Sequence, residues 1–171
     1  MKKILILMLA VISFAACNQE AKPAPQQQNK AVQNTQNEQG YVLPGLKGDS
    51  YDFTTKISEK PVVVAFMAGF CGWCKKMIPY MNDLAGQVPE TQADVIIAFI
   101  DESPTTLVSL EPVRAAKKIK IHYDARGLME QYGVRGFPTI MLFQNGKQIE
   151  TWHGYSPAHV DDILETLKDL K

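Results

Sequence analysis

Residues 61–75 read PVVVAFMAGFCGWCK, and this stretch decides how the rest of the chain is interpreted. The run from Val62 to Met67 is apolar and rich in β-branched residues, which predicts a strand buried on both faces. From Gly72 to about Gln87 the apolar residues recur at helical spacing. Cys71 and Cys74 therefore stand where a buried strand passes into the first turn of a helix.

This position of the two cysteines favours thiol–disulfide exchange. The N-terminus of a helix carries a partial positive charge and free N–H groups, which stabilise a thiolate relative to a thiol. The spacing of three residues lets the second sulfur reach back and close a small disulfide ring. The pattern predicts redox chemistry at Cys71 and Cys74.

A structural zinc site and a pair of inert core thiols are the alternatives. A zinc site needs four ligands, but the chain offers one further cysteine and three histidines, none in a compact pair with the motif: Cys17, His122, His153 and His159. Gly72 and Trp73, between the two cysteines, suit an exposed turn better than a core. We therefore expect neither a metal nor a cofactor.

The first 16 residues have the pattern of a secretory signal peptide. Lys2 and Lys3 are followed by an apolar run from Ile4 to Ala16, and a basic start, an apolar stretch and small residues at its end are typical of such signals. A membrane-spanning helix needs about 20 apolar residues, so this run is too short for a permanent anchor.

Phe14-Ala15-Ala16-Cys17 resembles the lipobox of bacterial lipoproteins, although an aliphatic residue is usual at the position of Phe14. The resemblance implies cleavage before Cys17 and acylation of that cysteine, so that membrane lipid becomes a partner. Several acyl chains make such attachment stable, because one chain alone is marginal. The alternative is cleavage at the same bond that leaves Cys17 as the free thiol of a soluble protein.

Residues 17–40 are predicted to form a disordered tether, and residues 41–171 one folded domain. The tether is rich in Gln, Asn, Ala and Pro and poor in large apolar side chains, so it buries too little surface to offset its ordering entropy. The remaining length is usual for one domain with one core. The chain has 18 basic and 18 acidic residues, a balance that does not indicate nucleic-acid binding.

The rest of the folded part alternates between strand and helix patterns. We expect a β-hairpin over Tyr41–Phe53, a strand over Asp94–Ile100, helical stretches over Thr105–Lys118 with a break at Pro112 and over Arg126–Tyr132, a short strand near 119–123, a hairpin of Thr139–Phe143 and Lys147–Trp152, and a final helix that begins with Ser156 as its N-cap and Pro157. This order predicts an α/β fold with a mixed central sheet.

Three separated segments make the chain similar to thioredoxin-fold oxidoreductases over nearly all of residues 41–171. Pro79 stands where thioredoxins carry a proline that kinks the helix, Tyr132–Thr139 resembles the segment around their cis-proline, and Phe143–Lys147 resembles the turn before their last strand. The resemblance implies the thioredoxin fold, a central mixed β-sheet flanked by helices, with the N-terminal β-hairpin as an extension.

The hairpin, the signal and the additional segment Ser103–Ile121 are similar to the extracytoplasmic TlpA/ResA-like branch of that family. This resemblance implies a monomeric disulfide reductant on the extracytoplasmic face of a bacterial membrane, which is the periplasmic side in a Gram-negative cell. Its partners would be extracytoplasmic proteins with disulfides, including apocytochromes c, and a membrane thiol reductase as electron donor.

The resemblance and the electrostatics of the helix assign the same roles to the site residues. Cys71 is expected to be the nucleophile and Cys74 the resolving thiol. Pro138 is implied to be the cis-proline that faces the pair, with the backbone of Phe137 free to bind an extended substrate segment. Trp73 is expected to form an apolar lip for the substrate, with a purely structural packing role as the alternative.

The acid that these proteins place near the cysteines is missing. Thioredoxins usually bury an aspartate six positions before the first cysteine, where this chain has Ala65, and ResA-like proteins place a glutamate six positions after it, where this chain has Met77. The lysine that accompanies the aspartate is replaced by Ile97. We expect water, Asp101 or Glu102 to accept the proton of the resolving thiol.

Two other functions fit the pattern less well. A thiol oxidant or isomerase shares the motif, but isomerases of this type usually carry a separate dimerisation domain, for which the folded part leaves no room. A copper chaperone of the Sco type uses a CxxxC pair with a distant histidine, whereas this chain has CxxC and late histidines at His153 and His159.

Overall fold

The two strands predicted to be buried on both faces lie side by side at the centre of a sheet. In the computed structural model, which describes residues 40–170, β3 (Val62–Met67) pairs in parallel with β4 (Asp94–Phe99), and every residue of both strands is buried. Apart from Asp94 at the start of β4, both strands consist of apolar residues, as expected for strands that are covered on both sides.

Three further strands complete a five-stranded mixed sheet in the order β5-β4-β3-β6-β7. β6 (Thr139–Gln144) runs antiparallel to β3 and continues through a tight turn into the edge strand β7 (Lys147–His153). The turn has positive φ at Asn145 (53°) and Gly146 (75°), which two-residue hairpins require. The opposite edge is β5 (Lys120–His122), parallel to β4.

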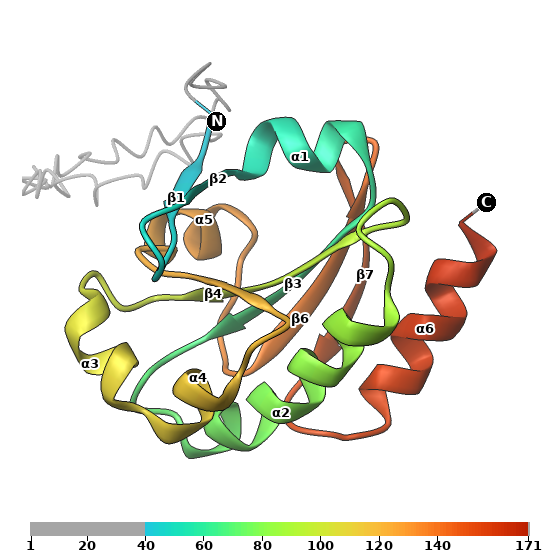
Figure 1. The fold of residues 1–171 in the computed structure, drawn as a ribbon. Helices are drawn as coiled ribbons and strands as arrows, with labels where there is room; N and C mark the ends of the chain where they lie inside the picture. Colours follow the sequence, from blue (N-terminus) through green and yellow to red (C-terminus); the bar gives the residue numbers. More distant parts are fainter. Residues whose placement is uncertain (1–39, 171) are drawn as a thin grey trace, which may run out of the picture. The chain divides into compact units, whose positions relative to one another are not determined.

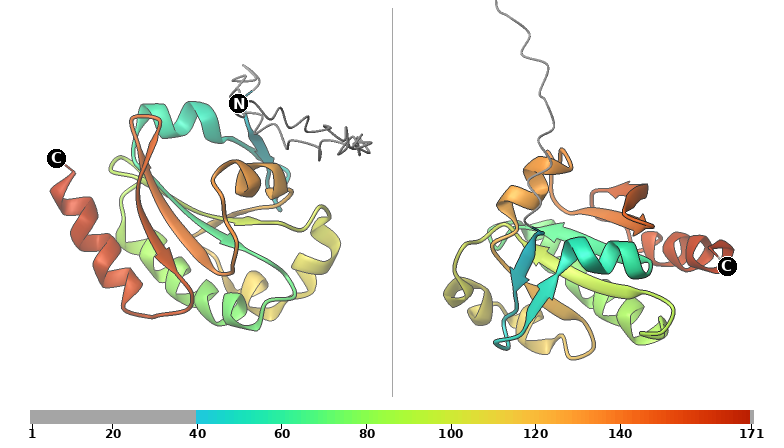
Figure 2. Two further views of the ribbon diagram at one scale, coloured as in Figure 1. Left: turned by 180° about the vertical axis from the view of Figure 1, so that it is seen from behind. Right: turned by 90° about the horizontal axis from the view of Figure 1, so that it is seen from above.

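Helices cover both faces of this sheet (Figure 1). One face packs against α2 (Gly72–Gln87), α6 (His159–Asp169) and the short helices α3 (Pro104–Ser109) and α4 (Glu111–Ala115). The other face packs against α5 (Arg126–Gln131), α1 (Phe53–Glu59) and a separate hairpin of β1 (Val42–Pro44) and β2 (Ser50–Asp52). Figure 2 shows these elements on the two faces of the sheet from behind and from above. The fold class predicted from the sequence is confirmed.

The helix α1 (Phe53–Glu59) was not predicted from the sequence. The side chain of Asp52 accepts a hydrogen bond from the backbone N–H of Thr55 at 3.0 Å, which caps the helix N-terminus. Phe53 and Ile57, one helical turn apart, are its buried residues. The capping aspartate followed by apolar residues four positions apart was the available signal.

The predicted start of the last helix is wrong by two residues. Ser156 and Pro157 form a turn before the helix, in which the carbonyl of Ser156 accepts the N–H of His159 at 3.2 Å. The N-cap is Ala158, whose side chain makes no capping hydrogen bond. Packing of Ile163 and Leu167 against the sheet sets this helix, rather than a capping side chain.

The predicted signal peptide, Cys17 and most of the tether lie outside the described residues. Within residues 40–170, no helix has both the length and the apolar character needed to cross a membrane.

The predicted helical stretch over 105–118 is two helices, α3 and α4, that meet at Leu110, and Pro112 stands in the first turn of α4. A proline is tolerated there because the first N–H groups of a helix have no intrahelical partner.

Candidate active site

The cysteine pair lies at the start of α2, immediately after the turn that leaves β3. Cys71 is the N-cap of α2, and its sulfur accepts the backbone N–H of Cys74 at 3.1 Å. The N–H of Cys71 donates to the carbonyl of Ala68 at 3.0 Å, which fixes the turn between strand and helix. Both cysteines are free thiols, and the sulfur of Cys71 receives the unpaired donors and the partial positive charge of the helix end.

The two thiols differ in their exposure. Cys71 is half-buried, whereas Cys74 is fully buried in the apolar cluster on the α2 side of the sheet. Burial raises the pKa of the Cys74 thiol, and its interaction with the Cys71 side chain raises that pKa further. At neutral pH, Cys74 therefore keeps its proton, and Cys71 is the sulfur that a partner molecule can reach.

The loop before β6 brings a cis peptide bond to the same place. The Phe137–Pro138 bond is cis, and the carbonyl oxygen of Phe137 lies 3.7 Å from the sulfur of Cys71, within reach of a weak S–H donor. The ring of Phe70, which precedes Cys71, packs edge-on against the ring of Phe137 at 6.4 Å. Cys71 and Phe137, which are 66 positions apart in the sequence, thus meet at the dithiol.

Aromatic side chains gather beside the first turns of α2. Trp73 is 56% exposed, and its ring stacks on Tyr155 with centroids 5.5 Å apart, while Tyr80 packs edge-on against the same Tyr155 ring. The ammonium group of Lys76 lies 4.4 Å from the centre of the Trp73 ring. With Phe70, which is 79% exposed, these rings form an aromatic rim that the sequence indicated only at Trp73.

Comparison with known proteins identifies the fold and its chemistry. The profile of the family described as a thioredoxin-like domain matches residues 54–170. The chain belongs to the thioredoxin-like family. Thioredoxin of Staphylococcus epidermidis is 30% identical over 122 residues, which cover 71% of this chain and 93% of that protein. Thioredoxin of Rickettsia typhi is 34% identical over 94 residues, 55% of this chain and 68% of that protein.

Solved structures extend the likeness of this thioredoxin-like chain. The exposed lipoprotein thioredoxin of Streptococcus pneumoniae has a TM-score of 0.64 and 25% identity, over 77% of this chain and 100% of that one. A putative thiol:disulfide interchange protein DsbE of Chlorobium tepidum has a TM-score of 0.62 and 24% identity, over 77% of this chain and 92% of that one. The protein is a thioredoxin-like thiol:disulfide oxidoreductase.

Protein disulfide-isomerases match only in part. Protein disulfide-isomerase A5 of Mus musculus is 27% identical over 114 residues, which cover 67% of this chain but 18% of that protein. This chain therefore spans less than a fifth of that relative.

An apolar layer lies beneath the dithiol of this thioredoxin-like domain. Ala65 pairs with Ile97 on β4 and with Ile140 on β6, and all three side chains have no exposed surface. Met77, at the position of the glutamate in ResA-like proteins, is also fully buried. The residues that replace the familiar acids thus form part of a continuous apolar core against which Cys74 packs.

The two acids considered as proton acceptors have different surroundings. Asp101 accepts the N–H of Gly69 at 2.8 Å, so its carboxylate holds the loop that leads to the cysteines. A Cβ atom at Gly69 would lie 2.8 Å from the same carboxylate, which explains why this position has no side chain. Glu102 is exposed and lies 3.7 Å from Arg126, across an ion pair at the surface. Of the two, Asp101 is the one that contacts the active-site loop.

The late histidines contact groups other than the thiols. Within residues 40–170, no three His, Cys, Asp or Glu side chains gather as a metal site would require. One ring nitrogen of His153 lies 3.4 Å from the hydroxyl of Thr139, and a ring nitrogen of His159 lies 3.9 Å from Asp162. Neither of these two histidines therefore supplies the third ligand of a copper site of the Sco type.

Proposed function

We propose that this protein reduces disulfides of extracytoplasmic proteins through Cys71 and Cys74. The observation that supports the proposal most strongly is the unequal environment of the two sulfurs, one half-exposed at a helix N-terminus and the other buried and held protonated. This arrangement separates a thiol that attacks from a thiol that resolves.

The reaction proceeds in two exchange steps. The Cys71 thiolate attacks one sulfur of the substrate disulfide, an Sγ–S bond forms, and the other substrate sulfur leaves as a thiolate that takes up a proton. Cys74 then loses its proton and attacks the Cys71 sulfur, which closes the Cys71–Cys74 disulfide and releases the second substrate thiol. Two electrons pass from the dithiol to the substrate, and a membrane thiol reductase restores the dithiol.

The surface around Cys71 suits an extended polypeptide. Pro138 has no N–H, and the backbone of Phe137 beside the attacking sulfur offers hydrogen-bonding groups to a substrate strand. Trp73 is exposed next to this place, where its ring provides apolar contact area for the substrate.

The reduction potential of the Cys71–Cys74 pair tests this proposal directly. Equilibration of the protein with glutathione redox buffers, followed by quantification of the disulfide form, gives the potential. A reductant should have a value near that of thioredoxin, about −270 mV, whereas a value near −120 mV is typical of an oxidant such as DsbA. The second result would transfer the protein to the oxidant class while leaving the dithiol chemistry intact.

We also propose that Cys17 is acylated and anchors the domain to the extracytoplasmic face of the membrane. The lipobox-like segment 14–17 and the likeness to a lipoprotein thioredoxin support this location. Cys17→Ser should move the protein from the membrane fraction to the soluble fraction without loss of reductase activity. A wild-type protein that is already soluble after cell fractionation would favour simple secretion instead.

A further inference from the structure

A second concave region of the surface lies away from the dithiol. A groove of about 500 Å³ is bounded by the β1–β2 turn, α3, α4 and β5. Its floor is apolar and is formed mainly by Val108, Val113, Ile119 and Ile121. Three of these are buried, while Val108 is 46% exposed. None of the lining residues belongs to the dithiol, the cis-proline loop or the aromatic rim.

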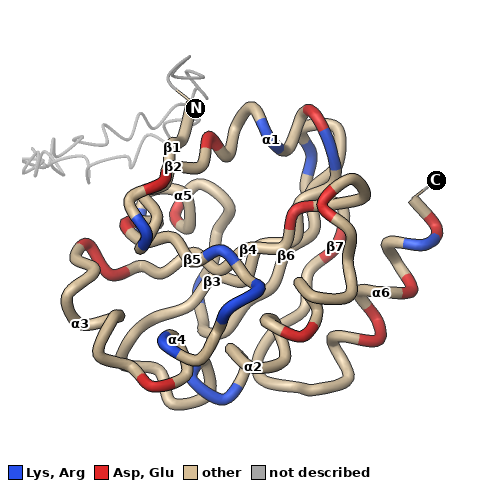
Figure 3. The backbone as a smooth tube through the Cα atoms, viewed as in Figure 1, with Lys and Arg blue, Asp and Glu red and all other residues tan. Residues whose placement is uncertain are grey.

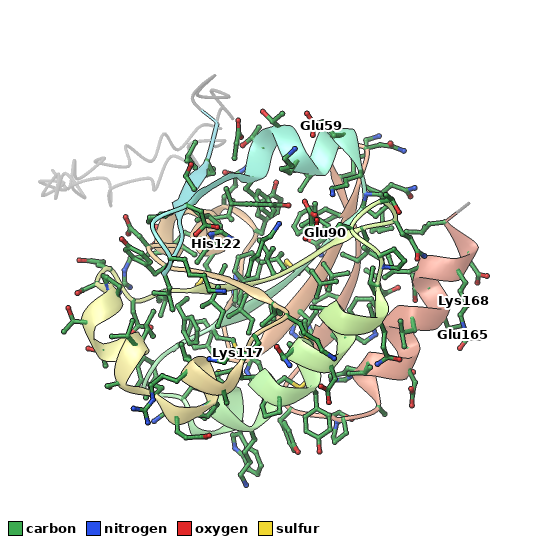
Figure 4. All side chains as sticks on the ribbon, in the orientation of Figure 1. Glu59, Glu90, Lys117, His122, Glu165 and Lys168 are labelled. Atoms are coloured by element: carbon green, nitrogen blue, oxygen red, sulfur yellow. The ribbon has the colours of Figure 1, made fainter. Side chains whose placement is uncertain are left out.

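Cations surround this apolar floor. Lys47, Arg114, Lys117 and Lys120 line the groove together with one acid, Asp49, and all five residues are exposed. Figure 3 shows the basic positions along α4, before β5 and at the hairpin turn, and Figure 4 labels Lys117. The whole chain balances 18 basic and 18 acidic residues, so this concentration of positive charge is local. An anion that enters the groove is attracted from several sides.

The edge of β5 does not offer its backbone to an extended peptide. The carbonyl of Ile121 accepts the N–H of Leu46 at 3.0 Å, and the N–H of Tyr123 donates to the carbonyl of Pro44 at 3.0 Å. The N-terminal hairpin thus already pairs with the outer edge where an added strand would bind. Recognition in the groove must depend on side chains, and its volume lies within the range of small-molecule sites, about 300–1,000 Å³.

The basic wall of the groove is held in place by the redox helix. The side-chain oxygen of Asn82 on α2 accepts the backbone N–H groups of Lys117 at 2.9 Å and Lys118 at 2.8 Å. The side chain of Lys117 donates to the carbonyl of Arg114 at 2.6 Å. These contacts order the segment before a ligand arrives, which reduces the entropic cost of binding.

We propose that this groove binds a single-chain amphipathic carboxylate of the fatty-acid class. The alkyl chain would lie on the floor between Val108 and Ile121, and the carboxylate would lie at the rim beside Arg114, whose planar guanidinium matches a carboxylate with two parallel hydrogen bonds. The lysines of the rim add positive potential as point charges. This binding activity is independent of the disulfide chemistry.

Calorimetric titration of the full chain with dodecanoate, below its micelle concentration and at low salt, tests the proposal. The double variant Arg114→Glu/Lys117→Glu should weaken saturable one-to-one binding by about tenfold or more, since each rim charge contributes modestly. The matched variant Lys147→Glu/Lys168→Glu makes the same change of charge on β7 and α6 and should bind as the wild type does. Both variants keep the wild-type N-terminal segment, so any binding of dodecanoate to that segment contributes equally to both titrations.

Three further titrants and one activity measurement complete the experiment. Acetate has the carboxylate without the alkyl chain, and dodecyl maltoside has the alkyl chain without the negative charge. Each should bind at least about tenfold more weakly than dodecanoate. Equal affinity for either compound, or equal loss in the two double variants, would overturn the proposal. Tighter binding of an acidic peptide would also overturn it and would assign the groove to a protein partner. Disulfide-reductase activity should be unchanged in the groove variant, which shows that it is folded.

Discussion

The two faces of the central sheet bury different kinds of side chains. On the face that carries the dithiol, the buried cluster consists of Cys74 and apolar residues. Among the described residues, the buried polar side chains belong to the other face: Asp94, His122 and Thr139. Strand register places them there, because they pair with Val62, Ala98 and Phe66, which all belong to the second cluster.

This difference shows where the protein places its proton-binding groups. Within residues 40–170, the dithiol face offers Cys74 no buried carboxylate, so the thiol remains neutral until a group from the loop or a water molecule takes its proton. On the second face, Tyr51 donates its hydroxyl to Asp94 at 2.9 Å, and Lys60 pairs with the same carboxylate at 2.7 Å. The Tyr51–Asp94 contact holds the hairpin to the sheet on the face opposite the dithiol.

Replacement of the two sulfurs, one at a time, should have the largest effect on the dithiol face. Cys71→Ser should reduce the rate of insulin disulfide reduction to the uncatalysed level, because the attacking sulfur is absent. Cys74→Ser should also stop turnover but should accumulate the mixed disulfide with substrate, visible by mass spectrometry. Mixed disulfides in the Cys71→Ser variant rather than in Cys74→Ser would reverse the roles.

A carboxylate introduced beneath the dithiol should lower stability and speed resolution. Ala65→Asp buries an acid without a designed partner, at a cost of about 1–3 kcal/mol in the free energy of unfolding. The new base beside the resolving thiol should accelerate release of the mixed disulfide in stopped-flow measurements.

The control for this variant is Ala65→Asn, which has a similar shape but no basic carboxylate. Ala65→Asn should be less stable than the wild type but should not release the mixed disulfide faster. Equal release rates in wild type and a folded Ala65→Asp variant would mean that Asp101 or a fixed water already accepts the proton.

On the second face, Tyr51→Phe should lower stability and leave redox activity unchanged. Burial and the negative charge of Asp94 raise the pKa of the Tyr51 hydroxyl, so it remains a donor throughout the physiological range. Loss of its hydrogen bond to a charged acceptor should cost about 1–2 kcal/mol in urea unfolding. A change in the reductase rate larger than twofold would show that the two faces are coupled.

His122 should make the second face sensitive to acid. Its ring, labelled in Figure 4, is fully buried and has no hydrogen-bond partner among residues 40–170. The ring packs on that of Tyr51 with centroids 5.2 Å apart. Burial lowers the pKa of His122, as does nearby Lys120, while Asp49 acts in the opposite direction. As the pH falls below the unfolded-state pKa of about 6.5, the unfolded chain binds a proton that the folded one does not, so stability decreases toward the lower folded-state pKa.

Urea unfolding between pH 7.5 and pH 5 measures this effect. The wild type should lose at most about 1.4 kcal/mol per pH unit below pH 6.5 through this residue. His122→Phe, which retains a ring beside Tyr51, should have a correspondingly flatter profile. Identical profiles for the two proteins would mean that His122 is protonated in the folded state as easily as in the unfolded one.

The sequence predicted the elements whose signals are local and strong. Continuous apolar runs located β3 and β4, and Asn145-Gly146 located the last hairpin. The start of α6 was misplaced because a serine–proline pair also forms a turn, and only packing against the sheet decides between the two. The short helix α1 was missed because two buried residues are a weak pattern.

The site was predictable at the cysteines and less so around them. Tyr155 meets Trp73 only because the loop after β7 lies beside α2, a tertiary relation that no local pattern indicates. Tyr80 could have been found, since it follows Trp73 by two helical turns and therefore shares its face. The support of Gly69 by Asp101 likewise depends on the parallel pairing of β3 with β4.

Alkylation of the reduced protein tests the asymmetry of the dithiol most directly. Brief treatment with iodoacetamide at pH 7, followed by quenching and peptide mass mapping, reports how fast each sulfur reacts. Cys71 should be labelled while Cys74 lags well behind, because Cys71 is accessible at the helix N-terminus and burial keeps Cys74 protonated. Equal labelling of the two cysteines, or earlier labelling of Cys74, would contradict the account.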